Sequence, residues 1–96
     1  MIEPTTTVRR SARATFRRLD DGSAVVLHLD TAQYHGVNEV GAVIWELTEP
    51  GPTFEGLVAA VREQVEDPPT DLEADVEEFV YALKERGLID LVSSEP

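Results

Sequence analysis

The chain has 96 residues, 42% of them hydrophobic, which suits one globular domain with a single modest core. It contains no cysteine, which excludes disulfides, thiolate metal ligands and a cysteine nucleophile. The formal net charge is −11, but residues 1–18 carry five arginines and one glutamate, whereas the remainder carries three basic and eighteen acidic side chains. Because so acidic a remainder repels phosphate backbones, nucleic-acid binding would depend on the amino-terminal arginines alone.

Residues 1–11 contain Pro4 and a threonine run and show no apolar periodicity. We expect them to form a flexible basic arm ahead of one domain at residues 12–92, with residues 93–96 as a tail. The first residues contain no apolar signal core, and the longest apolar runs are far shorter than a bilayer span. A cytoplasmic protein is therefore expected.

Residues 12–19 and 24–29 predict two strands joined by a hairpin turn at Asp21-Gly22, because this pair tolerates the positive φ that tight turns need. A second turn at residues 30–32 leads into a third short strand at residues 33–37. These three segments predict an antiparallel meander. Its last strand would lie at the edge of the sheet and leave backbone groups unpaired.

The apolar period changes from two to 3.6 at Asn38, which can cap a first helix over residues 39–48. The apolar face expected for this helix contains Val40, Val43, Ile44 and Leu47. Pro50, Gly51 and Pro52 end it.

Thr53 can cap a second helix, whose apolar residues recur at helical spacing from Phe54 to Val65. Residues 70–73 have the form of a capping box at the start of a third helix over residues 71–86, and Gly87 is a natural residue to follow its end. Residues 88–92 are apolar enough to fold back as a wing-like strand.

Strands that precede helices, rather than alternate with them, predict an α+β fold in place of a parallel sheet. The expected order is an amino-terminal three-stranded antiparallel sheet followed by three short helices. Three helices with tight connections have the layout of a winged helix-turn-helix.

No pattern in the sequence indicates catalysis. Phosphate-binding loops, nucleophile elbows and zinc-protease motifs are all absent. His28 and His35 lack a third metal ligand at a set spacing, so surface or hydrogen-bonded histidines are the favoured interpretation. A DNA-recognition helix is also disfavoured, because the first half of the third helix is acidic.

An exposed strand edge beside an apolar helix is a known arrangement for binding an extended peptide, which adds to the sheet as a further strand. The candidate edge is residues 33–37. The candidate helix carries Val76, Phe79, Val80 and Leu83, although Val76 and Leu83 suit a core equally well. Because Phe79 and Val80 point about a quarter-turn apart, part of this stripe must face sideways.

Two runs in the sequence resemble the PqqD-like family, the peptide-recognition elements of ribosomal natural-product pathways. The more specific run is Tyr34-His35-Gly36-Val37-Asn38-Glu39-Val40-Gly41, followed by Ile44-Trp45-Glu46-Leu47. The weaker run has Asp75-Val76, Phe79, Leu83 and Gly87-Leu88. Within that family, the chain most resembles the stand-alone B1 proteins of lasso-peptide biosynthesis. Val37, where the family more often has leucine, is a mild departure.

This resemblance implies a non-catalytic protein without a cofactor or metal, which binds the leader peptide of a precursor and presents it to a separate B2-type cysteine protease. The leader would pair antiparallel to the third strand and pack on the third helix. Carried over by position, the peptide-binding residues would be Gln33, Tyr34, His35, Gly36, Val37, Asp75, Val76, Phe79, Val80 and Leu83. From the charge and the short apolar runs we expect no contact with nucleic acid or membrane, and we expect a monomer or a weak dimer through the edge strand.

Two alternatives remain open. The chain could be a non-catalytic winged-helix module that regulates or supports a folded protein partner, and would then have no affinity for an isolated peptide. Nucleic-acid binding through residues 1–18 would instead show steep salt dependence.

Overall fold

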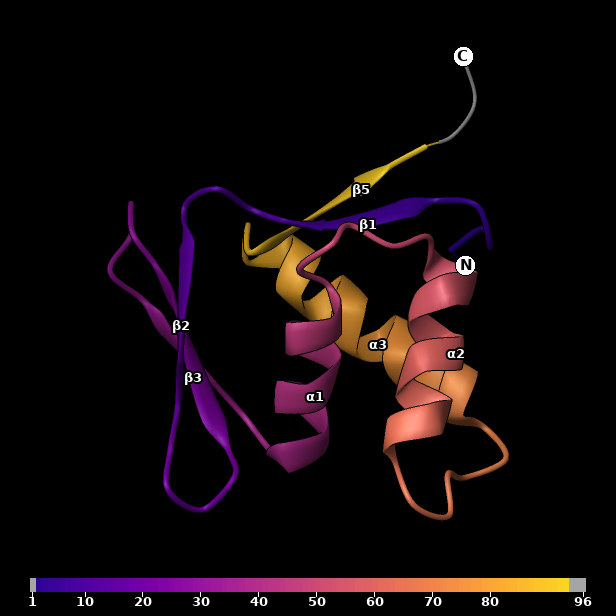
Figure 1. Cartoon of the computed structure of the whole chain (residues 1–96). Coiled ribbons are helices and arrows are strands. Elements are labelled where there is room, and N and C mark those ends of the chain that lie inside the picture. Colours follow the sequence, from indigo (N-terminus) through magenta and orange to yellow (C-terminus); the bar gives the residue numbers. More distant parts are fainter. Residues whose placement is uncertain (1, 94–96) are drawn as a thin grey trace.

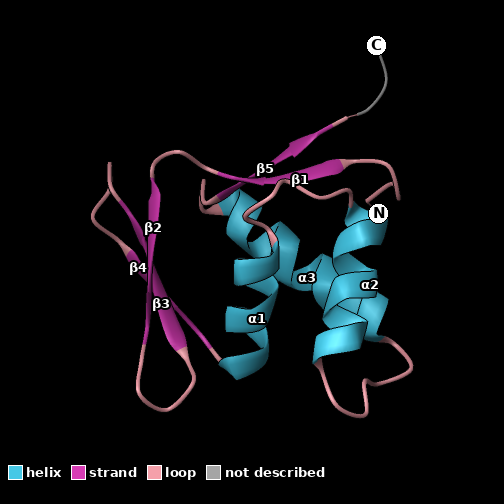
Figure 2. Ribbon diagram, viewed as in Figure 1, coloured by secondary structure: helices cyan, strands magenta, loops and turns pink. Residues whose placement is uncertain are grey.

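The computed structural model describes residues 2–93, which form three helices and two antiparallel sheets (Figures 1 and 2). In chain order the elements are β1 (Thr7–Arg10), β2 (Ala14–Arg18), β3 (Ala24–His28), β4 (Tyr34–Val37), α1 (Glu39–Leu47), α2 (Phe54–Gln64), α3 (Leu72–Glu85) and β5 (Ile89–Val92). The predicted α+β class is correct. The strands are not confined to the amino-terminal half, however, and form two sheets instead of one. Of the predicted tail, residues 94–96 lie outside the described residues.

The three-stranded sheet has the order β2-β3-β4 and confirms the predicted meander. Gly22 has φ +92 in the hairpin between β2 and β3, where its backbone N–H donates to the carbonyl of Leu19. The register pairs Phe16 with Val26 and Val26 with His35. These side chains therefore lie on one face of the sheet. This is the face that packs against the helices.

The amino-terminal segment differs from the expected flexible arm. Residues 7–10 form β1, which pairs antiparallel with β5 from the other end of the chain, as Figure 1 shows. Val8 is fully buried, and the backbone N–H of Ile2 donates to Glu77 Oε1 at 2.7 Å. The segment is ordered because it pairs with the last strand and bonds to α3. Both partners are distant in the sequence, so local sequence patterns do not reveal them.

Two of the three predicted helix caps form. The side chains of Asn38 and Thr53 accept from the backbone N–H groups of Gly41, at 2.8 Å, and of Gly56, at 3.2 Å. The predicted capping box of the third helix does not form. That helix begins at Leu72 after Asp71, whose side chain makes no capping hydrogen bond.

The end of α3 is fixed by a left-handed residue, as predicted. Gly87 has φ +75, and its N–H donates to the carbonyl of Lys84. The N–H of Leu88 reaches back to the carbonyl of Leu83 at 2.9 Å. These two bonds form a Schellman motif, which holds Arg86 in a defined position at the end of the helix.

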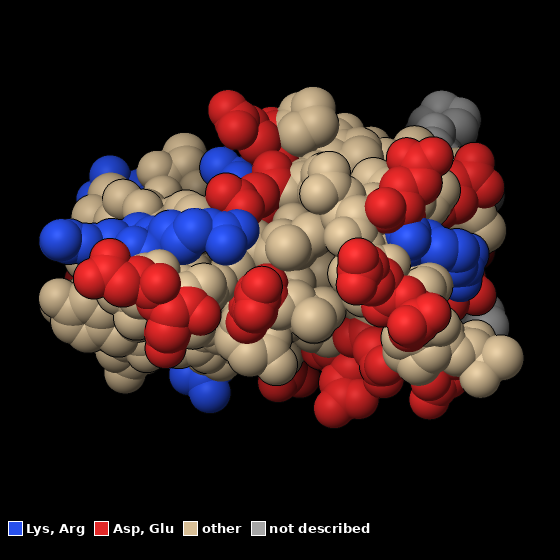
Figure 3. All heavy atoms as spheres, turned by 60° about the horizontal axis from the view of Figure 1, so that its bottom comes forward, with Lys and Arg blue, Asp and Glu red and all other residues tan. Residues whose placement is uncertain are grey.

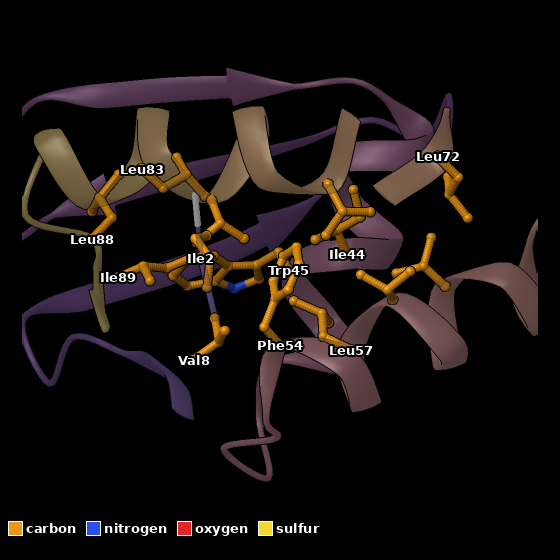
Figure 4. Close-up of a cluster of buried hydrophobic side chains, with 14 of the residues drawn as sticks. Ile2, Val8, Ile44, Trp45, Phe54, Leu57, Leu72, Leu83, Leu88 and Ile89 are labelled. Atoms are coloured by element: carbon orange, nitrogen blue, oxygen red, sulfur yellow. The ribbon is translucent and has the colours of Figure 1, made fainter. Parts of the chain in front are cut away.

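The core is centred on Trp45, which is 1% exposed and lies among side chains from all three helices, β1 and β5 (Figure 4). Its ring stacks on Phe16 of the sheet with centroids 6.1 Å apart. The predicted apolar face of α1 is wrong in part, since Val40 is exposed while Gly41, Ala42 and Trp45 are buried. α1 packs between the sheet and the other helices, so it buries two sides instead of one.

Candidate functional site

One free edge of the larger sheet belongs to β4, which pairs only with β3 in the described part of the chain; β2 forms the other edge. The N–H of His28 donates to the carbonyl of Gln33 at 3.0 Å, one step before the strand begins. Antiparallel pairing alternates, so His35 and Val37 also face β3 with their backbone groups. The N–H and C=O groups of Tyr34 and Gly36 consequently point away from the sheet.

The side chains of β4 divide between the two faces. Val37 is 7% exposed and packs with Ala24 and Ala42, and His35 is half-buried on the same face. Tyr34 is 70% exposed on the opposite face, and Gly36 has open space where a Cβ would stand. The edge is therefore accessible along its length without rearrangement of this chain.

The predicted helix residues separate into core and surface. Val76, Val80 and Leu83 are 0% exposed and belong to the core cluster. Phe79 is half-buried and Asp75 is exposed. At helical spacing, these two share a face of α3 with Ala82 and Arg86. This face is the part of the helix that a bound peptide can touch directly.

An apolar pocket of about 340 Å³ lies beyond the end of β4. It is lined by Asn38, Val40, Gly41, Ile44, Val65, Pro69, Leu72, Asp75, Val76 and Phe79. Gly41 allows α1 to pack closely against Phe79 and Val37. A Cβ at this position would lie 2.9 Å from Phe79 Cε1 and 3.0 Å from Val37 Cβ. The first turn of α1, the end of β4 and the middle of α3 therefore meet at one point.

Acidic side chains are numerous at this end of the molecule, with Lys and Arg side chains at its left and right in Figure 3. Figure 3 shows the face at which α1 begins and α2 ends, where a band of uncharged groups runs between clusters of carboxylates. Glu39, Asp71 and Glu78 are exposed next to residues that line the apolar pocket, and Asp75 is part of its lining. The pocket favours an apolar side chain, and its acidic surroundings favour a neutral or cationic neighbour.

A second, much smaller pocket lies at the start of β4, beside the end of α3. It is lined by His28, Gln33, Tyr34, His35, Arg86 and Leu88. Burial, and then the nearby charge of Arg86, lower the pKa of His35. Both effects favour the uncharged imidazole of His35 over the imidazolium.

The candidates predicted from sequence include β4, Asp75 and Phe79, but neither Arg86 nor the α1 side of the apolar pocket. Arg86 follows Phe79 by seven residues, a helical spacing that could have placed it on the same face. Among residues 2–93, no group of three potential metal-ligating side chains occurs. No helix in the same range is long and apolar enough to cross a membrane.

These features define an α+β protein with an open strand edge beside an apolar pocket, which is the geometry of a peptide-binding domain. A family model described as coenzyme PQQ synthesis protein D (PqqD) matches residues 23–89. The chain belongs to the PqqD family.

Two solved structures have the same fold. The first is TbiB1 in complex with the TbiA(beta) leader peptide, at 32% identity and a TM-score of 0.73, with 85% of this chain and 94% of that chain covered. The second is a lasso peptide synthetase B1 complexed with the leader peptide, at 24% identity and a TM-score of 0.70, with 86% and 96% covered. No curated protein matches the chain.

Proposed function

We propose that this protein binds the leader peptide of a ribosomally synthesised precursor, of the lasso-peptide type, by adding the leader as a strand to β4. The observation that carries the proposal is the free edge of β4 with the outward backbone groups of Tyr34 and Gly36, next to the apolar pocket. The likeness to TbiB1, a protein solved with a leader peptide, supports it.

The roles of the individual residues follow from their exposure. Tyr34 and Gly36 pair with the leader through their backbone groups, and Gly36 leaves room for a close approach. Phe79 packs against apolar leader side chains, while Asp75 accepts from a leader donor or cation. His35 and Val37 belong to the same strand with their backbone groups turned toward β3, and Gln33 directly precedes it. Val76, Val80 and Leu83 support Phe79 from within the core.

We further propose that the protein is not itself a catalyst and needs no cofactor. It acts in the cytoplasm, presents the bound leader to a separate B2-type cysteine protease, and is a monomer while the leader occupies β4. The β1–β5 ribbon takes the position of the wing in a winged helix-turn-helix formed with the three helices.

The test is a fluorescence-anisotropy titration of the labelled leader peptide encoded beside this gene. Gly36→Pro removes a donor that points away from β3, whereas Gly36→Ala keeps it, and a Cβ meets nothing within 4 Å there. We expect Gly36→Pro and Phe79→Asp to weaken binding at least tenfold, and Gly36→Ala to change it less than about threefold. Circular dichroism checks that each variant is folded.

N-methylation of single leader residues tests the same pairing without changing the protein. Strand addition predicts that binding is lost at alternate leader positions only, because every second N–H faces β4. Uniform tolerance of N-methylation, or no binding of any leader at about 50 μM, would reject strand addition. A winged-helix module for a folded partner would then be the leading interpretation, and steep salt dependence would indicate nucleic acid instead.

A further inference from the structure

The small pocket at the start of β4 concentrates hydrogen-bond donors in a protein with a net charge of −11. Its lining residues bring a guanidinium, two imidazoles and an amide, and no carboxylate is among them. Among the described residues, no acidic side chain pairs with Arg86. Asp30, whose backbone N–H donates to His28 Nδ1, is itself paired with Arg13 at 2.8 Å.

The hydrogen bonding of His28 orients its second nitrogen as a donor. Since Nδ1 accepts from the N–H of Asp30 at 3.1 Å, the proton of the neutral ring lies on Nε2. Nε2 lies against the last turn of α3, where a Cβ on Gly87 would approach it to 3.1 Å. The left-handed Gly87 thus brings the Arg86 turn and His28 close together.

We propose that this pocket, named here the carboxylate pocket (His28, His35 and Arg86), binds an Asp or Glu side chain of the leader. The inference rests on the proposed addition of the leader to β4. The pocket has a volume of about 10 Å³, close to the space that one water needs, so it admits a single carboxylate oxygen and not a whole phosphate. Arginine forms its strongest hydrogen bonds with such a group.

The position of the acidic residue in the leader follows from the directions of the elements. Val37, at the end of β4, lies by Phe79, whereas His35, nearer its start, lies by Arg86. A leader antiparallel to β4 therefore reaches the apolar pocket first and the carboxylate pocket afterwards. Side chains on one face of a strand recur every second residue. The acidic residue thus follows the apolar anchor by an even number of positions, two or four.

This arrangement would fix the register and direction of the leader. The apolar pocket has an acidic rim and the carboxylate pocket is rich in donors, so a leader that binds in the reverse direction places its acidic residue beside Asp75. Like-charge contact then opposes binding. The two pockets together would bind one apolar and one acidic side chain of the leader at a fixed spacing.

The test compares Arg86→Gln with Arg62→Gln, an exposed arginine on α2 whose loss changes the net charge equally. The probe is the labelled leader peptide encoded beside this gene, together with versions in which each Asp or Glu is replaced singly by its amide. We expect Arg86→Gln to weaken binding about tenfold or more and Arg62→Gln less than about twofold. One amide substitution should weaken binding to the unmodified protein and have little further effect in Arg86→Gln.

The outcomes separate this inference from the function on which it rests. If Phe79→Asp abolishes binding while Arg86→Gln and every amide substitution leave it unchanged, the leader-binding function stands and the carboxylate pocket is rejected. If the unmodified protein binds no leader, N-acetylglutamate amide is titrated while the His28 and His35 imidazole resonances are followed by NMR. Saturable shifts that Arg86→Gln removes would support a carboxylate pocket, and unchanged resonances would reject it.

Discussion

At the scale of single residues, His35 links the site to pH. Burial first, and then the charge of Arg86, lower its pKa in the folded protein below the ordinary value of 6.5. The unfolded chain therefore takes up a proton below pH 6.5 that the folded chain resists. The contribution of His35 to the unfolding free energy is therefore present above pH 6.5 and is lost as the pH drops toward the lowered pKa.

We expect His35→Gln to reduce the loss of unfolding free energy between about pH 7.5 and about pH 5.5, measured by urea titration. Other acid-sensitive groups remain in the variant, so the difference between the two proteins isolates His35. An identical pH dependence in both would show that His35 is protonated as easily in the folded chain as in the unfolded one.

Residue-level predictions from sequence succeeded where the determining interaction is local. Asn38, Thr53 and Gly87 fulfil their expected roles because a cap needs only three or four neighbouring residues. The capping box predicted at residues 70–73 does not form, although the sequence has the residue types of this motif. The reason is that α3 begins one residue later than expected. Arg86 was missed because its neighbours, His28 and His35, come from two other strands.

At the scale of elements, β1 contacts the helices through the buried Val8 and through Arg10. Arg10 lies 4.9 Å from the ring centroid of Trp45, and it donates to the Trp45 carbonyl at 2.8 Å and to Thr48 Oγ1 at 3.1 Å. Its neighbour Arg9 is exposed. Adjacent residues of a strand point to opposite faces, so two arginines of one strand have different roles.

We expect Arg10→Ala to lower the unfolding free energy by about 1–3 kcal/mol, because two hydrogen bonds from a charged donor and the contact with Trp45 are lost. Arg9→Ala, which removes the same charge, should change it by less than about 0.5 kcal/mol. Urea titration of both variants measures the difference. Equal effects would mean that net charge, and not the contact with Trp45, decides the stability of this segment.

Sequence reasoning missed β1 for a physical reason that concerns whole elements. A four-residue strand with polar neighbours has no periodicity of its own, and its partner β5 lies about eighty positions away, with Thr7 opposite Val92. The same limitation affected α1, where a single apolar stripe was expected and two faces are buried. The edge position of β4, in contrast, followed from the order of the strands.

At the scale of the whole molecule, Trp45 connects all layers. It stacks on Phe16 of the larger sheet, contacts Arg10 of the β1–β5 ribbon and lies within the cluster formed by the helices. Its burial requires every one of these layers, so separation of any layer exposes the ring. As the only tryptophan in the chain, it reports their assembly directly.

We therefore expect unfolding by urea to give the same midpoint from Trp45 fluorescence and from the helical circular dichroism signal, as a cooperative two-state transition requires. Arg10→Ala should shift both midpoints together, because the ribbon cannot detach without opening the core around Trp45. A saturating leader peptide should raise both midpoints, since it binds the folded chain only. If fluorescence changes at lower urea than the helical signal, the helices remain folded after the ribbon or the sheet has separated. The site on β4 would then be lost before the helices unfold.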